Sequence, residues 1–584
     1  MEKSQNFTEL SLRRALFLFV FALSAGFAVA GESPRNAGTP TATANNEAAK
    51  ETVNSPDAVQ ALQSKIAEQQ AQIDKLTRAV ELLTNRLNGT PASTTTANPA
   101  SAHDTSVGQV TSLVPVIPAR AAGAADPGLT VVSAANPRPA PAQGDQEAAS
   151  PLQFHIGTAA ITPVGFMDFT SVWRDHVGGS GIGTNFAGIP YGNAVFQNNL
   201  SEFRLSMQNS RIGFRVDADV KGAHVIGYME SDYLGNNPGN VAVSSNSNTL
   251  RSRLYWVDVR RPKWEVLGGQ TWSLITPGRS GISPLPGDLF FTQNIDVNYQ
   301  LGLVWGRIPE LRFVYHPSDK VAFAVALDSP EQYVGGSAGG GLITLPAALN
   351  TGTTYQGELN IGSNTLGVTN VAPDVIAKLA FDPSKRFHVE LGGIERSFKV
   401  WNPSTSQSFT ATGGGGFLNL NVEVFKGFRL LTNNFWSDGG GRYIFGQAPD
   451  LVARADGSIS PVHSGSTVSG FEFTHKNSMI YAYYGGMYVQ RNVAVDANGT
   501  SLIGYGYSGS PAGQNRAVQE GTFGVNQTVW KDPKWGAVNF MGQYSYLTRN
   551  PWSVAVGKPA DATMNMVFFN LRYTLPGSAP TLGK

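Results

Sequence analysis

The sequence has no cysteine, no long apolar run beyond its first thirty residues, and no clear excess of either charge. Without cysteine there is neither a disulfide nor a thiolate metal site, so stability must come from packing and backbone hydrogen bonds. The 43 basic and 42 acidic residues nearly cancel, which gives no overall field that would attract nucleic acid. With no apolar segment of the ~20 residues that a membrane helix needs, a membrane form would have to be a closed barrel.

Glycine and aromatic residues are abundant instead. The chain holds 65 glycines and 34 prolines, and 10% of its 584 residues are aromatic while only 15% are charged. Such a composition favours many short strands joined by turns over a helical or doubly wound fold. We therefore expect an all-β protein.

The N-terminus has the three-part pattern of an export signal. Basic residues precede the apolar stretch 15–23, and residues 28–30 are small. This order predicts a signal peptide over 1–30. A single membrane anchor is the alternative, but the apolar stretch is shorter than a bilayer requires.

A strongly periodic segment follows, between two segments with few large apolar residues. Residues 31–56 and 89–152 are rich in Ala, Thr, Pro and Ser, which predicts disordered linkers. Residues 57–88 carry a heptad seam, which predicts an α-helical coiled coil and hence self-association. The seam residues favour two strands, although Gln69 weakens that preference and leaves the number of chains open. They are Val59, Leu62, Ile66, Gln69, Ile73, Leu76, Val80, Leu83 and Leu87.

From Gly165 onward the apolar period becomes two. In 417–425, for example, Leu418 and Leu420 alternate with Asn419 and Asn421. Alternation of this kind is typical of strands with one apolar and one polar face. We expect sixteen strands, beginning near residues 165, 203, 222, 250, 263, 300, 319, 373, 385, 414, 428, 465, 477, 520, 534 and 563.

The connections between these strands alternate strictly between short and long. Seven pairs are joined by tight turns, such as those at 261–262 and 532–534. Transmembrane barrels have this asymmetry, with short periplasmic turns and longer extracellular loops. The sequence thus predicts a 16-stranded antiparallel transmembrane β-barrel over 153–584. A soluble β-sandwich or solenoid is the alternative, because it also contains alternating strands.

The layout resembles one group of Gram-negative porins, the DcaP-like trimeric porins, over roughly 57–575. This resemblance implies a homotrimer of barrels in outer-membrane lipid, each with its own pore for small, often anionic solutes. One departure is that residues 576–584 follow the last strand, whereas outer-membrane barrels usually finish on an aromatic residue. The similar stretches are Ser210-Arg211-Ile212-Gly213-Phe214, Gly269-Gln270-Thr271-Trp272-Ser273 and Pro309-Glu310-Leu311-Arg312-Phe313.

Charged residues on the polar face of the strands are the candidate pore lining. Strand parity places two basic pairs on either side of an acidic pair, close enough to form a ladder across the wall. This ladder could hold a transverse field in the pore, or its charges could neutralise one another within the wall. Arg312 and Lys378 add further cations to the same face. The ladder residues are Arg211, Arg215, Glu230, Asp232, Arg251 and Arg253.

The third long connection, which follows Ser273, is the candidate constriction loop. Its charged residues Arg279, Asp288 and Asp296 would then lie in the bore. An ordinary surface loop is the alternative.

Two strings that resemble catalytic motifs do not have the context that the motifs need. Residues 504–509 have dinucleotide-type glycine spacing and 335–339 have nucleophile-elbow spacing, but neither is predicted to lie between a strand and a helix. The eight histidines are scattered, with no pair at metal-ligand spacing. We therefore expect no enzyme activity, no cofactor and no metal.

Together these patterns predict a porin of the bacterial outer membrane, a water-filled channel for passive diffusion of small hydrophilic solutes and ions, with a weak preference for anions. Its N-terminal region would be periplasmic. The alternative function is an outer-membrane anchor, whose coiled coil tethers the membrane to the cell wall or to a periplasmic partner. No contact with nucleic acid is expected.

Overall fold

The computed structural model describes residues 150–178, 181–193, 195–235, 248–285, 293–335, 340–349, 358–359, 372–402, 405–445 and 447–577. The predicted signal peptide 1–30, the coiled coil 57–88 and the linker 31–56 lie outside the described residues, as does nearly all of the linker 89–152. No helix within the described ranges is long and apolar enough to cross a membrane.

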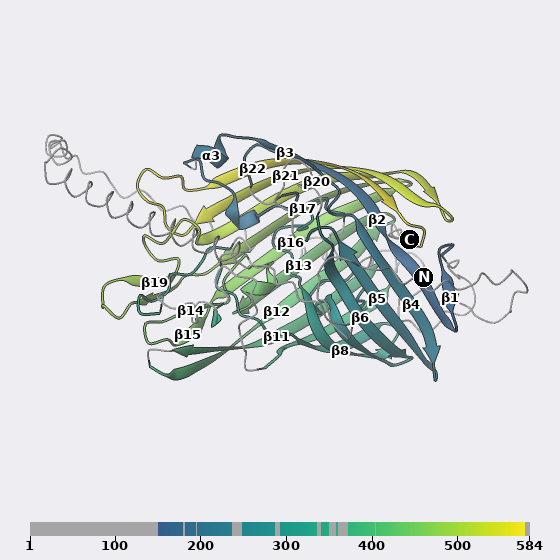
Figure 1. Ribbon diagram of the computed structural model, residues 1–584, viewed down its shortest axis with the longest axis horizontal. Coiled ribbons are helices and arrows are strands. Elements are labelled where there is room, and N and C mark those ends of the chain that lie inside the picture. Colours follow the sequence, from purple (N-terminus) through teal and green to yellow (C-terminus); the bar gives the residue numbers. More distant parts are fainter. Residues whose placement is uncertain are drawn as a thin grey trace, which may run out of the picture. The chain divides into compact units, whose positions relative to one another are not determined.

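Sixteen antiparallel strands form a closed barrel, as the sequence predicted (Figure 1). The first and last strands pair with each other, with Phe166 opposite Thr574, which closes the sheet and leaves no free edge. The strands of the barrel are β2 (Ala159–Arg174), β3 with β4 (Glu202–Ser206 and Arg211–Val220), β5 (Ala223–Asp232), β6 (Arg251–Arg261), β7 (Trp264–Trp272), β8 (Arg307–Ser318), β9 (Val321–Asp328), β10 (Asp374–Ser384), β11 (Phe387–Asn402), β12 (Gln407–Phe425), β13 (Phe428–Asp438), β16 (His463–His475), β17 (Ser478–Val489), β20 (Asn515–Asp532), β21 (Gly536–Pro551) and β22 (Ala562–Thr574).

The second strand of the barrel is interrupted. Its first part, β3, pairs with the end of β2, with Phe203 opposite Trp173, and β4 pairs with the beginning of β2. Between the two parts, the hydroxyl of Ser210 accepts a hydrogen bond from the backbone N–H of Asp168 at 2.9 Å and donates one to its carbonyl at 3.2 Å. A side chain thus satisfies backbone groups that the interrupted ladder leaves unpaired.

Alternate residues of each strand face opposite sides of the wall. In β8, Leu311, Phe313 and Tyr315 are exposed on the outside, whereas Arg312 and Val314 are buried. This outward apolar and inward polar pattern is what a barrel in lipid requires, since lipid cannot hydrogen-bond a polar side chain.

The two ends of the barrel differ. At one end, seven turns of only two or three residues join the strand pairs; at the other, most connections are long and several contain elements of their own (Figure 1). The connection between β11 and β12 is the short one at this end, with four residues. The long connections pack on one another through buried apolar side chains such as Phe186, Val334 and Ile444. Their short elements are η2 (Phe186–Gly188), α3 (Val195–Asn198), η4 (Gly441–Tyr443), β14 (Leu451–Ala453), β15 (Ile459–Pro461), β18 (Asn492–Val495) and β19 (Leu502–Tyr505), while β1 (Phe154–Ile156) pairs with β2 near the N-terminus.

Four predicted strand beginnings were wrong by five residues or more. The strand expected from residue 300 begins only at Arg307, because Leu301 and Val304 are buried residues of the preceding loop. Conversely, the strands expected from 165, 414 and 520 begin five to seven residues earlier, in stretches whose alternation is weak.

Candidate functional site

The described parts of the connection between β7 and β8, residues 273–285 and 293–306, lie in the interior of the barrel. Arg279 makes two hydrogen bonds to the carboxylate of Glu472 in β16, at 2.8 and 2.7 Å. Further along, the backbone N–H of Ile295 donates to Gln543 in β21 at 2.6 Å. Strands β16 and β21 are far from β7 in the order of the sheet, so the connection reaches across the bore.

Side-chain oxygens of the far wall hold this loop by its backbone. Glu520 accepts a hydrogen bond from the N–H of Leu301 at 2.9 Å, and Asn433 accepts one from the N–H of Val304 at 3.1 Å. A loop buried inside a barrel has no strand to pair with, so its N–H groups need such acceptors. The inward polar residues of β13, β20 and β21 therefore position the loop.

Asp296 anchors the same loop on its other side. Its carboxylate accepts hydrogen bonds from the backbone N–H of Asn298 at 2.8 Å and from the backbone N–H and hydroxyl of Thr184. Burial raises the pKa of the Asp296 carboxyl above its ordinary value, although the hydrogen bonds from Thr184 act in the opposite direction. The loop is thus joined to the connection between β2 and β3.

The structure brings the predicted charge ladder of β4, β5 and β6 together as ion pairs. Arg253 lies between two carboxylates, 2.7 Å from Glu230 and 2.7 Å from Asp232. Arg211 is 3.7 Å from Glu230, and Arg251 is 2.8 Å from Asp232. Of the two expectations for these charges, the geometry favours mutual neutralisation.

The other predicted residues on the wall are also paired. Arg215 lies apart from the ladder and is 2.6 Å from Asp217 of its own strand. Arg312 is 2.5 Å from Glu310 and donates to the carbonyl of Trp272, while the ammonium of Lys378 donates to Glu390 and to the carbonyl of Thr276. The predicted loop residue Asp288 lies outside the described residues.

One basic residue that we did not predict is left without an acidic partner. Within the part of the chain that the structure describes, Arg307 makes no ion pair, and its Nη1 has no hydrogen-bond partner. Its guanidinium is 5.8 Å from the ring centres of both Trp272 and Trp305, which are buried aromatic residues. Arg307 therefore adds an uncompensated positive charge beside the ladder.

A tyrosine of the loop completes this part of the wall. The hydroxyl of Tyr299 accepts hydrogen bonds from Arg211 and Arg253, both at 3.4 Å. Its ring lies 5.8 Å from that of Trp272 and 5.4 Å from that of Trp305. Guanidinium groups and aromatic rings thus line the same region, as is common where arginine meets aromatic faces.

A cavity of about 240 Å³ opens between the loop and strands β10 to β13, close to the short turns. Four arginine and lysine side chains, one histidine (His388) and one carboxylate, that of Asp382, line it. The cations come from different elements, so the fold rather than one stretch of sequence produces the positive character. They are Arg279, Lys385, Arg386 and Arg429.

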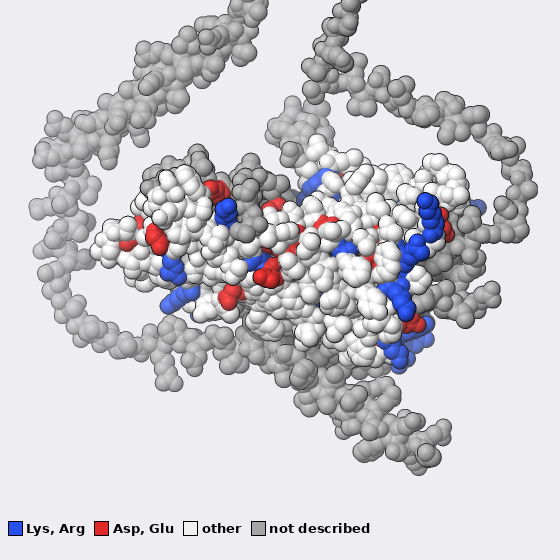
Figure 2. All heavy atoms as spheres, turned by 90° about the horizontal axis from the view of Figure 1, so that it is seen from below, with Lys and Arg blue, Asp and Glu red and all other residues white. Residues whose placement is uncertain are grey.

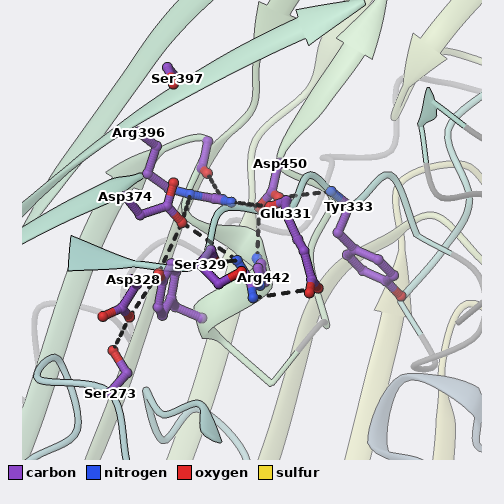
Figure 3. Close-up of polar contacts among 12 residues, drawn as sticks. Ser273, Asp328, Ser329, Glu331, Tyr333, Asp374, Arg396, Ser397, Arg442 and Asp450 are labelled. Carbon is purple, nitrogen blue, oxygen red and sulfur yellow. Dashed lines mark hydrogen bonds and ion pairs between the residues drawn. The ribbon is translucent and has the colours of Figure 1, made fainter. Parts of the chain in front are cut away.

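At the opposite end, a buried network joins three of the long connections (Figure 3). Arg396 in β11 is 3.0 Å from Asp374 and 2.9 Å from Asp450, which lies in the connection after β13. The hydroxyl of Tyr443 donates to Asp374 at 3.0 Å, and Ser273 donates to Asp328 at 2.6 Å. These contacts fix the connection after β13 against the wall where the crossing loop begins.

The chain forms a closed barrel of sixteen antiparallel strands with short turns at one end, and the described parts of the connection between β7 and β8 make hydrogen bonds to the far wall inside it. The fold is porin-like. That conclusion rests on the strand pairing and on the course of residues 273–306.

Comparisons with known proteins found similarity at the level of the structure only. No protein-family model and no curated protein matches the sequence. The structure is similar to the outer membrane channel DcaP of Acinetobacter baumannii, with 16% identity and a TM-score of 0.49, over 71% of this chain and 97% of that chain. It is also similar to OprB of Pseudomonas putida, with 11% identity and a TM-score of 0.39, over 70% of this chain and 94% of that chain. OmpF of Salmonella typhi has 10% identity and a TM-score of 0.39, over 72% and 99%.

Proposed function

We propose that the chain is a porin of the bacterial outer membrane, which forms a water-filled channel for passive diffusion of small hydrophilic solutes. The observation that carries this proposal is the passage of residues 273–306 through the interior of a closed barrel. A loop in that place narrows the bore and brings charged side chains into the path of a solute, which is how diffusion channels select.

The preferred solutes are anions. The ladder charges are paired, so the residual field comes from cations that lack a close acid. Arg307 is such a cation, and Lys385 and Arg386, which line the cavity, make no ion pair among the described residues. A solute that passes these cations meets a positive potential, which raises the local concentration of anions.

The pore lining consists of the ladder, Arg312 and Lys378, with Arg279 and Asp296 as the constriction residues. The short turns face the periplasm and the long connections face the exterior, as in other barrels of this kind. On this orientation the N-terminal region is periplasmic. The barrel assembles as a homotrimer, with the coiled coil at 57–88 contributing to the association.

The second candidate function is an anchor that grips the cell wall through the coiled coil. The coiled-coil residues 57–88 that an anchor would need lie outside the described residues, whereas a loop inside the barrel is a feature expected of a channel. We therefore place the channel first. A chain without residues 57–88 should conduct as the whole chain does if the channel is the function.

Single-channel recording tests the proposal directly. Purified protein in a planar bilayer should give conductance steps that close in thirds, as expected for a trimer of separate pores. In a salt gradient the reversal potential should have the sign of anion preference. A folded barrel that inserts but never conducts would contradict the proposal and would favour the anchor.

A further inference from the structure

Every short turn of the barrel contains a lysine. The seven turns comprise only fifteen residues between strand ends, and seven of those are lysines: Lys221, Lys263, Lys320, Lys385, Lys426, Lys476 and Lys534. Lysine makes up only 16 of the 584 residues of the chain, so fifteen positions would hold fewer than one by chance. The lysine content of the turns is therefore far higher than the composition of the chain would give by chance.

The lysines are segregated to this end of the barrel. Eight of the eleven described lysines lie in these turns or, in the case of Lys531, two residues before a turn. Only Lys399 and Lys558 lie toward the end with the long connections, and Lys378 lies inside the barrel. Figure 2 shows basic side chains gathered at the right-hand end of the face in view, which is the end where the short turns lie in Figure 1.

Turn formation does not account for the choice of lysine. Tight hairpin turns favour Gly, Asn, Asp and Pro, because these residues accept or fix the backbone angles of the turn. Lys221 and Lys476 adopt φ angles of 50° and 52°, a left-handed conformation that residues with a long side chain rarely take. At these two turns a positive charge is present in spite of the backbone preference.

None of the eight lysines is neutralised by the protein. All are exposed, and no ion pair involves them within the described residues. Arg261, also exposed, donates a hydrogen bond to the backbone carbonyl of Lys221 at 3.1 Å and likewise has no acidic partner. The turns therefore present a ring of free cations around the rim.

The neighbouring aromatic residues indicate what the ring contacts. Trp264, Phe425 and Trp535 are exposed by 37%, 52% and 59%, and each is adjacent in sequence to a turn lysine. The ammonium of Lys534 lies 5.2 Å from the ring centre of Trp535. Exposed aromatic residues at strand ends mark the level of the membrane interface, so the lysines lie at the depth of the lipid headgroups.

We propose that these turns bind the headgroups of anionic phospholipids, such as phosphatidylglycerol, in the leaflet that faces the periplasm. Successive turns are separated by two strands, or about 10 Å along the rim, so each lysine can meet a different headgroup. Apart from the side on which the barrels of the proposed trimer associate, lipid is the partner that meets these turns around the barrel. Lys385 and Arg386 line the inward cavity and are left out of this set. The inference rests on the proposed membrane location and orientation.

The preference for anionic lipid can be measured with the whole chain folded into phosphatidylcholine bilayers. Trace spin-labelled phosphatidylglycerol or phosphatidylcholine reports the fraction of lipid immobilised at the protein surface. We expect the immobilised fraction to favour phosphatidylglycerol by about threefold to fivefold at low salt, because each surface lysine adds attraction for an anionic headgroup. At 1 M salt the ratio should approach one. A ratio near one at low salt would overturn the proposal without any variant.

Matched variants locate the effect on the rim. Replacing five turn lysines (K263Q, K320Q, K426Q, K476Q and K534Q together) should bring the ratio close to one. The double variant K426Q/K534Q should lose part of the preference, whereas K399Q/K558Q removes the same charge at the other end and should lose none. The proposal would be overturned if the variant with five substitutions kept the full preference for phosphatidylglycerol. It would also be overturned if K399Q/K558Q lost as much of that preference as K426Q/K534Q.

Two further measurements separate this inference from its alternatives. Cosedimentation with purified cell-wall sacculi tests another polyanion: if the fivefold variant loses sacculus binding but keeps its lipid ratio, the ring serves the cell wall and the proposal is wrong. Conductance of the same samples tests the channel. A wild-type protein that never conducts but prefers phosphatidylglycerol would contradict the proposed function and support the lipid site.

Discussion

The inner surface of the barrel has two walls of different chemistry. The wall made by β4 to β8 carries guanidinium groups, among them Arg253 and Arg307, beside aromatic rings. The wall made by β13 to β21 carries amides and carboxylates, such as Asn433 and Gln543, which accept hydrogen bonds from the backbone of the crossing loop. The difference indicates that one wall positions the constriction and the other gives it its charge.

On the wall made by β4 to β8, an arginine in ion pairs and an arginine without an acidic partner should have different effects when they are replaced. Arg253 is fixed between Glu230 and Asp232 and contributes to folding, whereas Arg307 has no acid to neutralise it. Removing the first should therefore affect stability, and removing the second should affect selectivity.

Loss of Arg253 should have the largest effect. R253L would leave the carboxylates of Glu230 and Asp232 short of a partner in a buried place, which typically costs about 3–5 kcal/mol. The free energy of unfolding of the lipid-embedded barrel in denaturant measures the loss. R251Q is the control, because Arg251 is 40% exposed and the change should cost under about 1 kcal/mol. Equal losses in the two variants would show that burial does not matter here.

The amide wall should be less sensitive, and its loss should appear in the current. Q543L removes the acceptor of the Ile295 N–H and of the Tyr481 hydroxyl, which weakens the hold on the loop by about 1–3 kcal/mol. We expect larger conductance and greater open-channel noise in single-channel recordings. Q519L is the matched control, since among the described residues the side-chain oxygen of Gln519 accepts a hydrogen bond only from the exposed Tyr484. If Q519L raises the noise as much, the loop is not held by this wall.

Arg307 should act mainly on selectivity. R307Q removes a charge that has no ion-pair partner among the described residues and loses its contacts with the Trp272 and Trp305 rings, so stability should change by about 2 kcal/mol or less. The ratio of anion to cation permeability, taken from the reversal potential, should fall roughly twofold, as expected for one charge near a partly screened path. An unchanged reversal potential would place Arg307 away from the path of the ions.

The smallest effect concerns pH. Burial raises the pKa of Asp296, so folding favours its neutral form, and the loop is held most firmly below the ordinary pKa of an aspartate. This contribution is lost as the pH rises through the raised pKa. Conductance should therefore be modestly lower at pH 4 than at pH 8, and D296N should reduce that difference. A D296N channel with the pH profile of the wild type would assign the dependence to other groups.

Much of the fold could be predicted because local pattern and topology agree. The two-residue turn at Pro262 follows directly from turn chemistry, and inward Asn419 and outward Leu418 follow from a period of two. The strand expected at 300 failed for a physical reason: the loop residues Leu301 and Val304 are apolar because they pack inside the barrel, and they resemble a strand.

The site was predicted less completely because it depends on contacts between distant residues. Parity placed Arg253 beside Glu230 and Asp232, but it gave no sign that Arg307 lacks an acid, since that depends on which strands are neighbours. In β8, Ile308 and Arg312 face inward, so strict alternation would have turned Arg307 outward. Tyr299 was missed because nothing in the loop sequence shows which wall it meets.

The most direct test of the constriction uses the absence of cysteine from the chain. Ser280 lines the cavity between the crossing loop and the wall, so S280C would place a single reactive thiol there. A charged methanethiosulfonate reagent added to a conducting channel should lower its conductance irreversibly, with no effect on the wild type. If mass spectrometry shows complete labelling of S280C and the conductance does not change, residues 273–306 do not form the constriction.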